Sequence, residues 1–219
     1  MAITLGNVPP LDFIPVAEDC GLILPIGDWV LRTACRQAKS WRDEGLCLER
    51  IAVNVSVLQF NQTNFPDRVK EILQETNLEP SILELEITES VLMDDADRTI
   101  DTLNRLKAVG VQLAIDDFGT GYSSLSYLKQ FPIDRLKIDR SFIKAITASA
   151  DDRAIACAVI SMADNLNLRV TAEGVETVGQ MNVLQEENCN EAQGYYISRP
   201  MPAEDAGRFL HELELAKAS

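Results

Sequence analysis

The sequence predicts an α/β fold with alternating strands and helices, and it favours a (β/α) barrel of the TIM type. Two observations carry this prediction. From about residue 50 to the C-terminus, short runs rich in β-branched residues alternate with longer amphipathic stretches. In nearly every strand-like run, a polar residue stands close to the end. Because the alternation alone also suits a doubly wound open sheet, the polar residues decide between the two folds.

Six segments are expected to be strands, since each is short, mostly apolar and bracketed by turn residues or helix starts. They are residues 51–56, 83–88, 111–116, 135–139, 169–173 and 192–197. The polar residues that interrupt them are Asn54, Glu86, Asp116, Lys137, Glu173 and Gln193. In a closed barrel, the carboxyl ends of the strands converge on one axis and build the active site. The sequence therefore predicts a barrel with an acidic mouth.

Seven amphipathic segments are expected to be helices, two of them before the first strand. They span residues 10–17, 26–41, 67–76, 95–109, 151–165, 177–187 and 203–215. Asp or Thr at several starts and Gly110 after one end fit helix caps. Trp29 and Trp41 fall on apolar spacings of the second helix, so we expect both in the core. The length fits a single domain over residues 1–219.

The composition excludes several classes of function. The chain has 34 acidic and 20 basic residues, and its formal net charge of −14 opposes binding to DNA, RNA or an anionic bilayer. No apolar stretch approaches a membrane span and no secretory pattern is present, so we expect no membrane insertion and a cytoplasmic location. The five cysteines are never spaced as C-x-x-C and are expected to be reduced and mostly buried. His211 is the only histidine, in a polar helix pattern, which argues against Ser-His-Asp and Cys-His catalysis.

The polar strand ends point to a metal site. Converging carboxylates repel one another unless divalent cations neutralise them. The oxygen ligands on offer are Asn54, Glu86, Asp116 and Asp117. This set, without histidine or cysteine, suits Mg²⁺ or Mn²⁺ rather than zinc or copper.

Two such ions recur in enzymes that hydrolyse phosphoesters. In that chemistry, Lys137 would lie beside the attacking water or a phosphate oxygen, and Glu173 would accept the proton of the water. Any one of these residues alone is more often a surface or capping residue. The recurrence from strand to strand carries the prediction.

A loop follows the third predicted strand, with the sequence D-D-F-G-T-G-Y-S-S-L over residues 116–125. Its two glycines permit backbone geometries that other residues avoid, and loops of this kind beside a metal site contact phosphate or change conformation. Glu89, one turn beyond Glu86, would hold this loop by accepting hydrogen bonds from its amides or hydroxyls.

With these features together, the chain resembles the EAL family of bacterial cyclic di-GMP phosphodiesterases. The matching segments are F-I-P-V-A-E (13–18), N-V-S (54–56), L-E-L-E-I-T-E-S (83–90), D-D-F-G-T-G-Y-S-S-L (116–125), L-K-I-D (136–139), A-E-G-V-E (172–176), Q-G-Y (193–195) and S-R-P (198–200). The match runs from about residue 5 to the C-terminus. Its D-D-F-G-T-G and E-x-T-E motifs are very specific.

The resemblance implies a modified (β/α) barrel that hydrolyses cyclic di-GMP to linear pGpG with two Mg²⁺ or Mn²⁺ ions and often works as a dimer. Carried over by motif, the implied metal ligands are Asn54, Glu86, Asp116 and Asp117. Lys137 and Glu173 would handle the attacking water. Gln193 would bind waters around the metal, Glu89 would anchor the loop, and Glu176 would lie on the substrate side or behind the metal ligands.

One part of the family pattern is missing. Family members begin with two strands before F-I-P-x-A-E, and the second strand carries the E-A-L motif, whose glutamate binds metal and whose neighbouring arginine contacts a substrate phosphate. We therefore expect six of eight strands, a barrel incomplete at the N-terminus, weakened metal binding and very slow or no hydrolysis by this chain alone.

The incomplete pattern has two consequences. The alternative function is a non-catalytic module that binds cyclic di-GMP or a protein partner on the same scaffold. In either case the strands at 51–56 and 192–197 would flank the gap with unpaired backbone edges. The chain would then self-associate, use residues 2–8 as a makeshift strand, or be poorly stable, and we favour a homo-oligomer.

Overall fold

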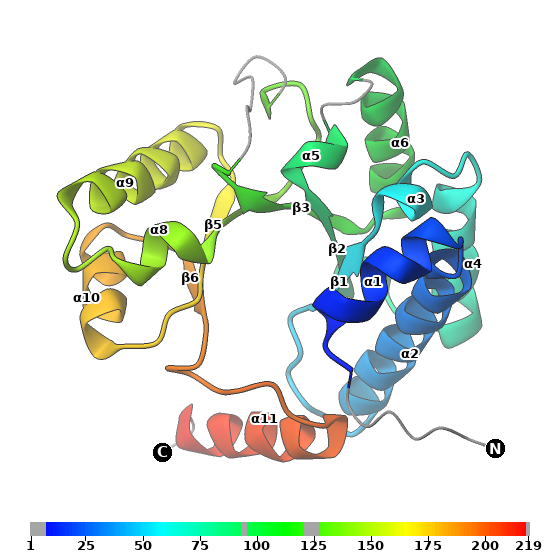
Figure 1. Cartoon of the computed structure of the whole chain (residues 1–219). Coiled ribbons are helices and arrows are strands. Elements are labelled where there is room, and N and C mark those ends of the chain that lie inside the picture. The colour runs from blue at the N-terminus through cyan, green and yellow to red at the C-terminus, as the bar shows by residue number, and fades with distance from the viewer. Residues whose placement is uncertain (1–7, 93–95, 121–127, 218–219) are drawn as a thin grey trace.

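The computed structural model describes residues 8–92, 96–120 and 128–217. Six parallel strands form one sheet in sequence order, β1 to β6, and the sheet curls into a half-barrel with helices around it (Figure 1). The strands are β1 (Ile51–Val55), β2 (Leu83–Thr88), β3 (Gln112–Phe118), β4 (Arg135–Ile138), β5 (Arg169–Glu173) and β6 (Glu191–Gln193). The predicted fold, an incomplete TIM-type barrel, is confirmed. Strands β1 and β6 are its two edges.

All seven predicted helices are present, with small differences at their ends. They are α1 (Pro10–Asp19), α2 (Ile23–Asp43), α4 (Phe65–Thr76), α6 (Ala96–Val109), α9 (Ala150–Asn165), α10 (Val178–Glu186) and α11 (Ala203–Lys217). Four short helical turns among the described residues were not predicted: α3 (Val57–Phe60), η1 (Pro80–Ile82), α5 (Glu89–Leu92) and α8 (Arg140–Lys144). They follow or precede strands directly and are too short to show a helical period. Three of them, α3, α5 and α8, begin within two residues of the carboxyl ends of β1, β2 and β4.

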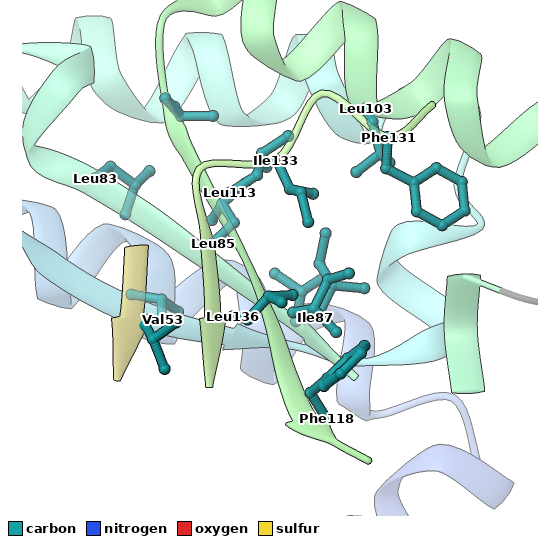
Figure 2. Close-up of a cluster of buried hydrophobic side chains, with 14 of the residues drawn as sticks. Val53, Leu83, Leu85, Ile87, Leu103, Leu113, Phe118, Phe131, Ile133 and Leu136 are labelled. Atoms are coloured by element: carbon teal, nitrogen blue, oxygen red, sulfur yellow. The ribbon is translucent and has the colours of Figure 1, made fainter. Parts of the chain in front are cut away.

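The two faces of the sheet differ in chemistry because side chains alternate along each strand. Figure 2 shows the apolar face, where Leu85, Leu113 and Leu136 from three neighbouring strands pack together. Leu103 from α6 packs into the same core. The opposite face carries charged residues such as Glu84, Glu86, Arg135 and Lys137. The hydrophobic core thus lies between sheet and helices, and the polar face lies inside the curl.

Three expectations about individual segments are wrong. Strand β6 ends at Gln193 rather than at residue 197, because the chain turns at Gly194, where an added Cβ would lie 2.2 Å from the carbonyl oxygen of Val175. Trp29 is 65% exposed, since the buried stripe of α2 runs along another side of the helix, and Trp41 is only partly buried. Among the cysteines only Cys35 is buried.

Other expectations agree with the structure. All five cysteines are free thiols, and the His211 side chain is exposed on α11. Within the described residues, we find no helix with the length and apolar character that a membrane crossing requires.

Candidate active site

Lys137 lies at the centre of the polar face, near the carboxyl ends of the strands. Its Nζ atom is 2.8 Å from Glu86 Oε1, 3.0 Å from Asp116 Oδ1 and 2.7 Å from Glu173 Oε1. These three acids come from β2, β3 and β5, so strands far apart in sequence converge here, as the sequence predicts. Lys137 is only 3% exposed. One buried ammonium thus faces three carboxylates.

A β-bulge adds a fourth carboxylate. Successive side chains in a regular strand point to opposite faces, yet Asp116 and Asp117 both reach the same site. The pairing of β3 with β4 shifts register between Ile115 and Phe118, and Asp117 has a φ of 54° in the left-handed region. As a result, carboxylate oxygens of Asp116, Asp117 and Glu173 lie within 4.8 Å of one another. A strained backbone at this point is the kind of feature that clusters at functional sites.

Burial and neighbouring charges shift the pKa values of these groups. It raises the pKa of Glu86 and of Glu173 above the usual range, although Lys137 beside them favours the charged form. Burial also raises the pKa of Asp117, and the negative charges of Asp116 and Asp139 raise it further. For Lys137, burial opposes the charge, but the three carboxylates outweigh it and raise the pKa. The protein alone leaves an excess of negative charge at this site.

This excess fits a bound cation. Lys137 supplies one positive charge against Glu86, Asp116, Asp117 and Glu173, and buried carboxylates without compensation are costly. The carboxylate oxygens of Asp116, Asp117 and Glu173 are close enough together to surround one ion. The residues present are therefore able to hold a metal ion, and their all-oxygen donor set suits a hard divalent cation.

The two predicted amide residues lie on the edge strands. Asn54 on β1 is in register with Glu86, and Gln193 on β6 is in register with Glu173. Both side chains are exposed. The hydrogen bonds and ion pairs of the described residues connect neither amide side chain to the carboxylates. The structure thus places Asn54 and Gln193 on either side of the acidic centre without direct contact to it.

Glu89 contacts the loop that follows β3. Its carboxylate is 3% exposed, and Oε2 accepts a hydrogen bond of 3.0 Å from the backbone N–H of Gly119. Glu89 Oε1 is buried and has no partner within the described residues. Gly119 itself has a φ of +98°, which requires glycine there. The remainder of the predicted loop, residues 121–125, lies outside the described residues.

Glu176 lines a small cavity beside the acidic centre. This cavity of about 200 Å³, which we call the side cavity, has as its walls Arg140, Glu173, Gly174, Glu176, Gln193, Gly194 and Tyr195. The Glu176 backbone N–H donates to Gln180 Oε1 at 2.7 Å, and Gln180 is buried at the start of α10. The turn that carries Glu176 is therefore held by the capping box of Thr177 and Gln180.

Sequence reasoning missed Asp139, which follows the last residue of β4. The negative charge of Asp139 is one of the causes that raise the pKa of Asp117. Burial opposes the charge of Asp139, but hydrogen bonding by Ser141, whose N–H lies 2.9 Å from Asp139 Oδ1, outweighs burial and lowers the pKa of Asp139. Its position two residues after Lys137, at the same strand end, was a signal that could have identified it.

Sequence reasoning also missed a second charged cluster at the amino ends of the strands. This cluster, called the floor network, consists of Arg50, Glu84, Arg135 and Glu191. Arg135 is 2.8 Å from Glu84 Oε2 and 2.8 Å from Glu191 Oε1, and Arg50 Nε is 3.2 Å from Glu84 Oε1. Arg50 also pairs with Glu191. Since Arg50 precedes β1 and Glu191 belongs to β6, the floor network connects the two edges of the sheet.

Comparisons with known proteins agree with this geometry. The family model described as EAL domain matches residues 3–200. Two relatives from Pseudomonas aeruginosa are similar to the chain: the bifunctional diguanylate cyclase/cyclic di-GMP phosphodiesterase MucR, 50% identical over 91% of the chain and 29% of its own length, and the cyclic di-GMP phosphodiesterase NbdA, 47% identical over 94% of the chain and 26% of its own length.

A solved structure is similar as well. The PaMucR phosphodiesterase in complex with c-di-GMP superimposes with a TM-score of 0.90 at 48% identity, covering 94% of this chain and 83% of that one. The chain spans less than a third of the length of the two curated relatives. The activities of those longer proteins as a whole are therefore not assigned to this chain.

Proposed function

The chain belongs to the EAL domain family, and on that premise we propose that it binds cyclic di-GMP and hydrolyses one phosphodiester to give linear pGpG. The observation that carries the proposal is the group of carboxylates around Lys137. This site lies at the carboxyl ends of parallel strands, where active sites of barrels form, and it has more negative than positive groups. A negatively charged phosphodiester can bind beside these carboxylates only when bound cations lie between them. The names of the relatives MucR and NbdA support the choice of substrate.

The metal-ligand roles follow the motifs shared with the EAL family, and the contacts of the other residues support theirs. Asn54, Glu86, Asp116 and Asp117 would hold Mg²⁺ or Mn²⁺. When bound, such ions neutralise phosphate charge and activate water. Their presence would offset the repulsion among the carboxylates of this site.

Glu173 is the residue that takes the proton of the attacking water. Its raised pKa suits a proton acceptor, because the protonated form is less unfavourable than for a solvated carboxylate. Lys137 stays charged between Glu86, Asp116 and Glu173, which fixes its Nζ atom and orients Glu173. Glu89 holds the loop at Gly119, and Glu176 and Gln193 lie on the substrate side, where they line the side cavity.

The experiment is product analysis with cyclic di-GMP and Mn²⁺ or Mg²⁺. We expect slow formation of pGpG by residues 1–219, and none in EDTA or with Glu173→Gln. Tight binding of cyclic di-GMP with no pGpG, even in single-turnover reactions, would favour the non-catalytic alternative instead. Absence of binding would contradict both.

We also propose that the chain self-associates through the edges of its sheet. Strand β1 contains no charged residue and no proline, and it is the kind of edge that recruits another strand. Sedimentation velocity checks this proposal: we expect a dimer or larger species at micromolar concentration. A monodisperse monomer would show that the edges are protected in some other way.

A further inference from the structure

Arg140 is a cation at the mouth that the proposed chemistry does not use. It follows Asp139 at the carboxyl end of β4 and forms one wall of the side cavity, directly beside Glu173. Its side chain is exposed, and within the described residues its guanidinium forms no hydrogen bond or ion pair. A cation next to so many carboxylates would be expected to pair with one of them, so its unpaired guanidinium calls for another partner.

The stem of Arg140 is held in place. Gly174 has a φ of +70°, and a Cβ atom there would lie 2.6 Å from the Cβ of Arg140. The turn after Glu173 therefore packs directly on Arg140 and leaves no room for any residue larger than glycine. This packing fixes where the Arg140 side chain starts, and the residue is exposed.

Lys137 cannot serve as a second cation for an anionic substrate. It is buried and shared among Glu86, Asp116 and Glu173, all at 3.0 Å or less. Cyclic di-GMP carries two phosphodiesters, and only the one being cleaved can lie at the carboxylates. The other phosphodiester needs a positive group a short distance away. Arg140 is the arginine that the side cavity presents in that place.

We propose that Arg140 binds the phosphodiester that is not cleaved, by donating guanidinium hydrogen bonds to its oxygens. This inference rests on the proposed function. Guanidinium groups match phosphate oxygens in a bidentate fashion, which a lysine cannot reproduce. The side cavity, at about 200 Å³, is smaller than the ~300–1,000 Å³ of typical small-molecule sites, so it takes one part of the dinucleotide and not the whole.

An aromatic residue in the lining of the side cavity suits a nucleotide. Tyr195 is 52% exposed, and the guanidinium of Arg199 stacks on its ring at 4.7 Å from the centroid. The turn that carries Tyr195 is fixed to the turn of Glu176, because the Tyr196 N–H donates to the Val175 carbonyl at 2.9 Å. Arg140 and Tyr195 thus both line the side cavity, and a nucleotide bound there would contact a guanidinium and an aromatic ring.

The test measures binding and turnover of cyclic di-GMP with Arg140→Gln, Arg140→Lys and a matched control, Arg208→Gln. Arg208 is an exposed arginine on α11 that pairs with Asp205, so the control makes the same charge change outside the side cavity. For Arg140→Gln we expect about tenfold weaker binding, as for one lost charge-assisted contact, and a weaker dependence of affinity on salt. Arg140→Lys should fall between Arg140→Gln and the wild type.

Hydrolysis kinetics distinguish a contact to the uncleaved phosphodiester from a contact to the cleaved one. A contact to the uncleaved phosphodiester persists unchanged through the reaction, so Arg140→Gln should raise KM and leave kcat unchanged. A fall in kcat would place Arg140 at the scissile bond and overturn the inference. Equal binding by Arg140→Gln and Arg208→Gln, with a wild type that binds and cleaves, would overturn it while the proposed function stands. A wild type that neither binds nor cleaves would refute both.

Discussion

The same polar face of the sheet carries two charged clusters that differ in charge balance. At the carboxyl ends of the strands, Lys137 faces the carboxylates of Glu86, Asp116 and Glu173. At the amino ends, the floor network pairs Arg50 and Arg135 with Glu84 and Glu191. Both clusters are largely buried and both connect distant strands. Among the groups that are mostly buried, only the floor network has equal numbers of positive and negative charges; Arg169, 3.8 Å from Glu191 Oε1, is exposed.

The difference gives a criterion for separating a candidate catalytic cluster from a structural one. Buried ion pairs are tolerated when each charge has a partner, and the floor network meets this condition within the protein. At the acidic mouth the carboxylates outnumber the one positive group, Lys137. The uncompensated negative charge is what a bound metal ion would neutralise. The most direct illustration is β2, where Glu84 and Glu86 point to the same face two residues apart and belong to different clusters.

The largest expected effect concerns turnover. Glu173→Gln removes the group that we propose takes the proton of the water, and general bases contribute roughly 10²–10⁴-fold to rates. We expect pGpG formation to fall by that factor while affinity for cyclic di-GMP changes little. The same substitution in the floor network, Glu191→Gln, serves as the control and should leave the chemistry intact. An equal loss of rate in both variants would remove the distinction between mouth and floor.

The next prediction compares two identical substitutions on β2. Glu84→Gln leaves Arg135 and Arg50 without their shared carboxylate, and breaking a buried pair costs roughly 3–5 kcal/mol of the free energy of unfolding. Glu86→Gln relieves acid crowding, because Lys137 keeps Asp116 and Glu173. In EDTA at neutral pH, we expect Glu86→Gln to be at least as stable as the wild type. Urea unfolding measures both, and comparable destabilisation by the two variants would contradict the contrast.

The floor network and the acidic mouth should also change the free energy of unfolding in opposite directions as the pH rises. Burial disfavours the charge of Glu191, but Arg50 and Arg135 more than compensate, and the net result is a lowered pKa. Its contribution is complete above the unfolded value of about 4.3 and is lost as the pH falls below it. Glu86 has a raised pKa, so in the metal-free protein stability declines as the pH rises from about 4.3 upward.

Thermal unfolding between pH 3 and pH 8 in EDTA separates the loss of stability at acidic pH from the decline at higher pH. Glu191→Gln should flatten the loss at the acidic end, and Glu86→Gln should flatten the decline above it. The effect of Glu191→Gln on stability should also depend little on salt concentration, because the buried floor network is screened less than surface ion pairs. If both variants alter stability in the same pH range, the two clusters are not independent.

Much of the mouth was predictable because it is built from strand ends. Lys137 and Glu173 interrupt apolar runs near their carboxyl ends, and parallel strands bring such positions together without knowledge of the register. The floor network was not predictable in this way. Glu84 and Arg135 lie near the beginnings of their strands, where charged residues are usually solvated or capping. Only the curl of the sheet brings Glu191 close to them.

Local backbone geometry explains the remaining differences. Neighbouring side chains in a regular strand point to opposite faces, and the bulge at Asp117 is what brings both predicted carboxylates to one site. Tyr195, Tyr196 and Ile197 read as a strand by composition, yet Gly194 turns the chain because its close contact with Val175 excludes a side chain. In both cases the deciding contact is made with another part of the chain, which periodicity does not reveal.

Metal binding tests the central claim most directly. Calorimetric titration of residues 1–219 with Mn²⁺ should show saturable binding, and the double variant Asp116→Asn with Asp117→Asn should lose it, because the cluster then lacks two of its four carboxylates. Glu84→Gln, examined under conditions where it remains folded, should keep the wild-type affinity. If the double variant binds Mn²⁺ as tightly as the wild type, the acidic mouth is not a metal site and the proposed chemistry is wrong.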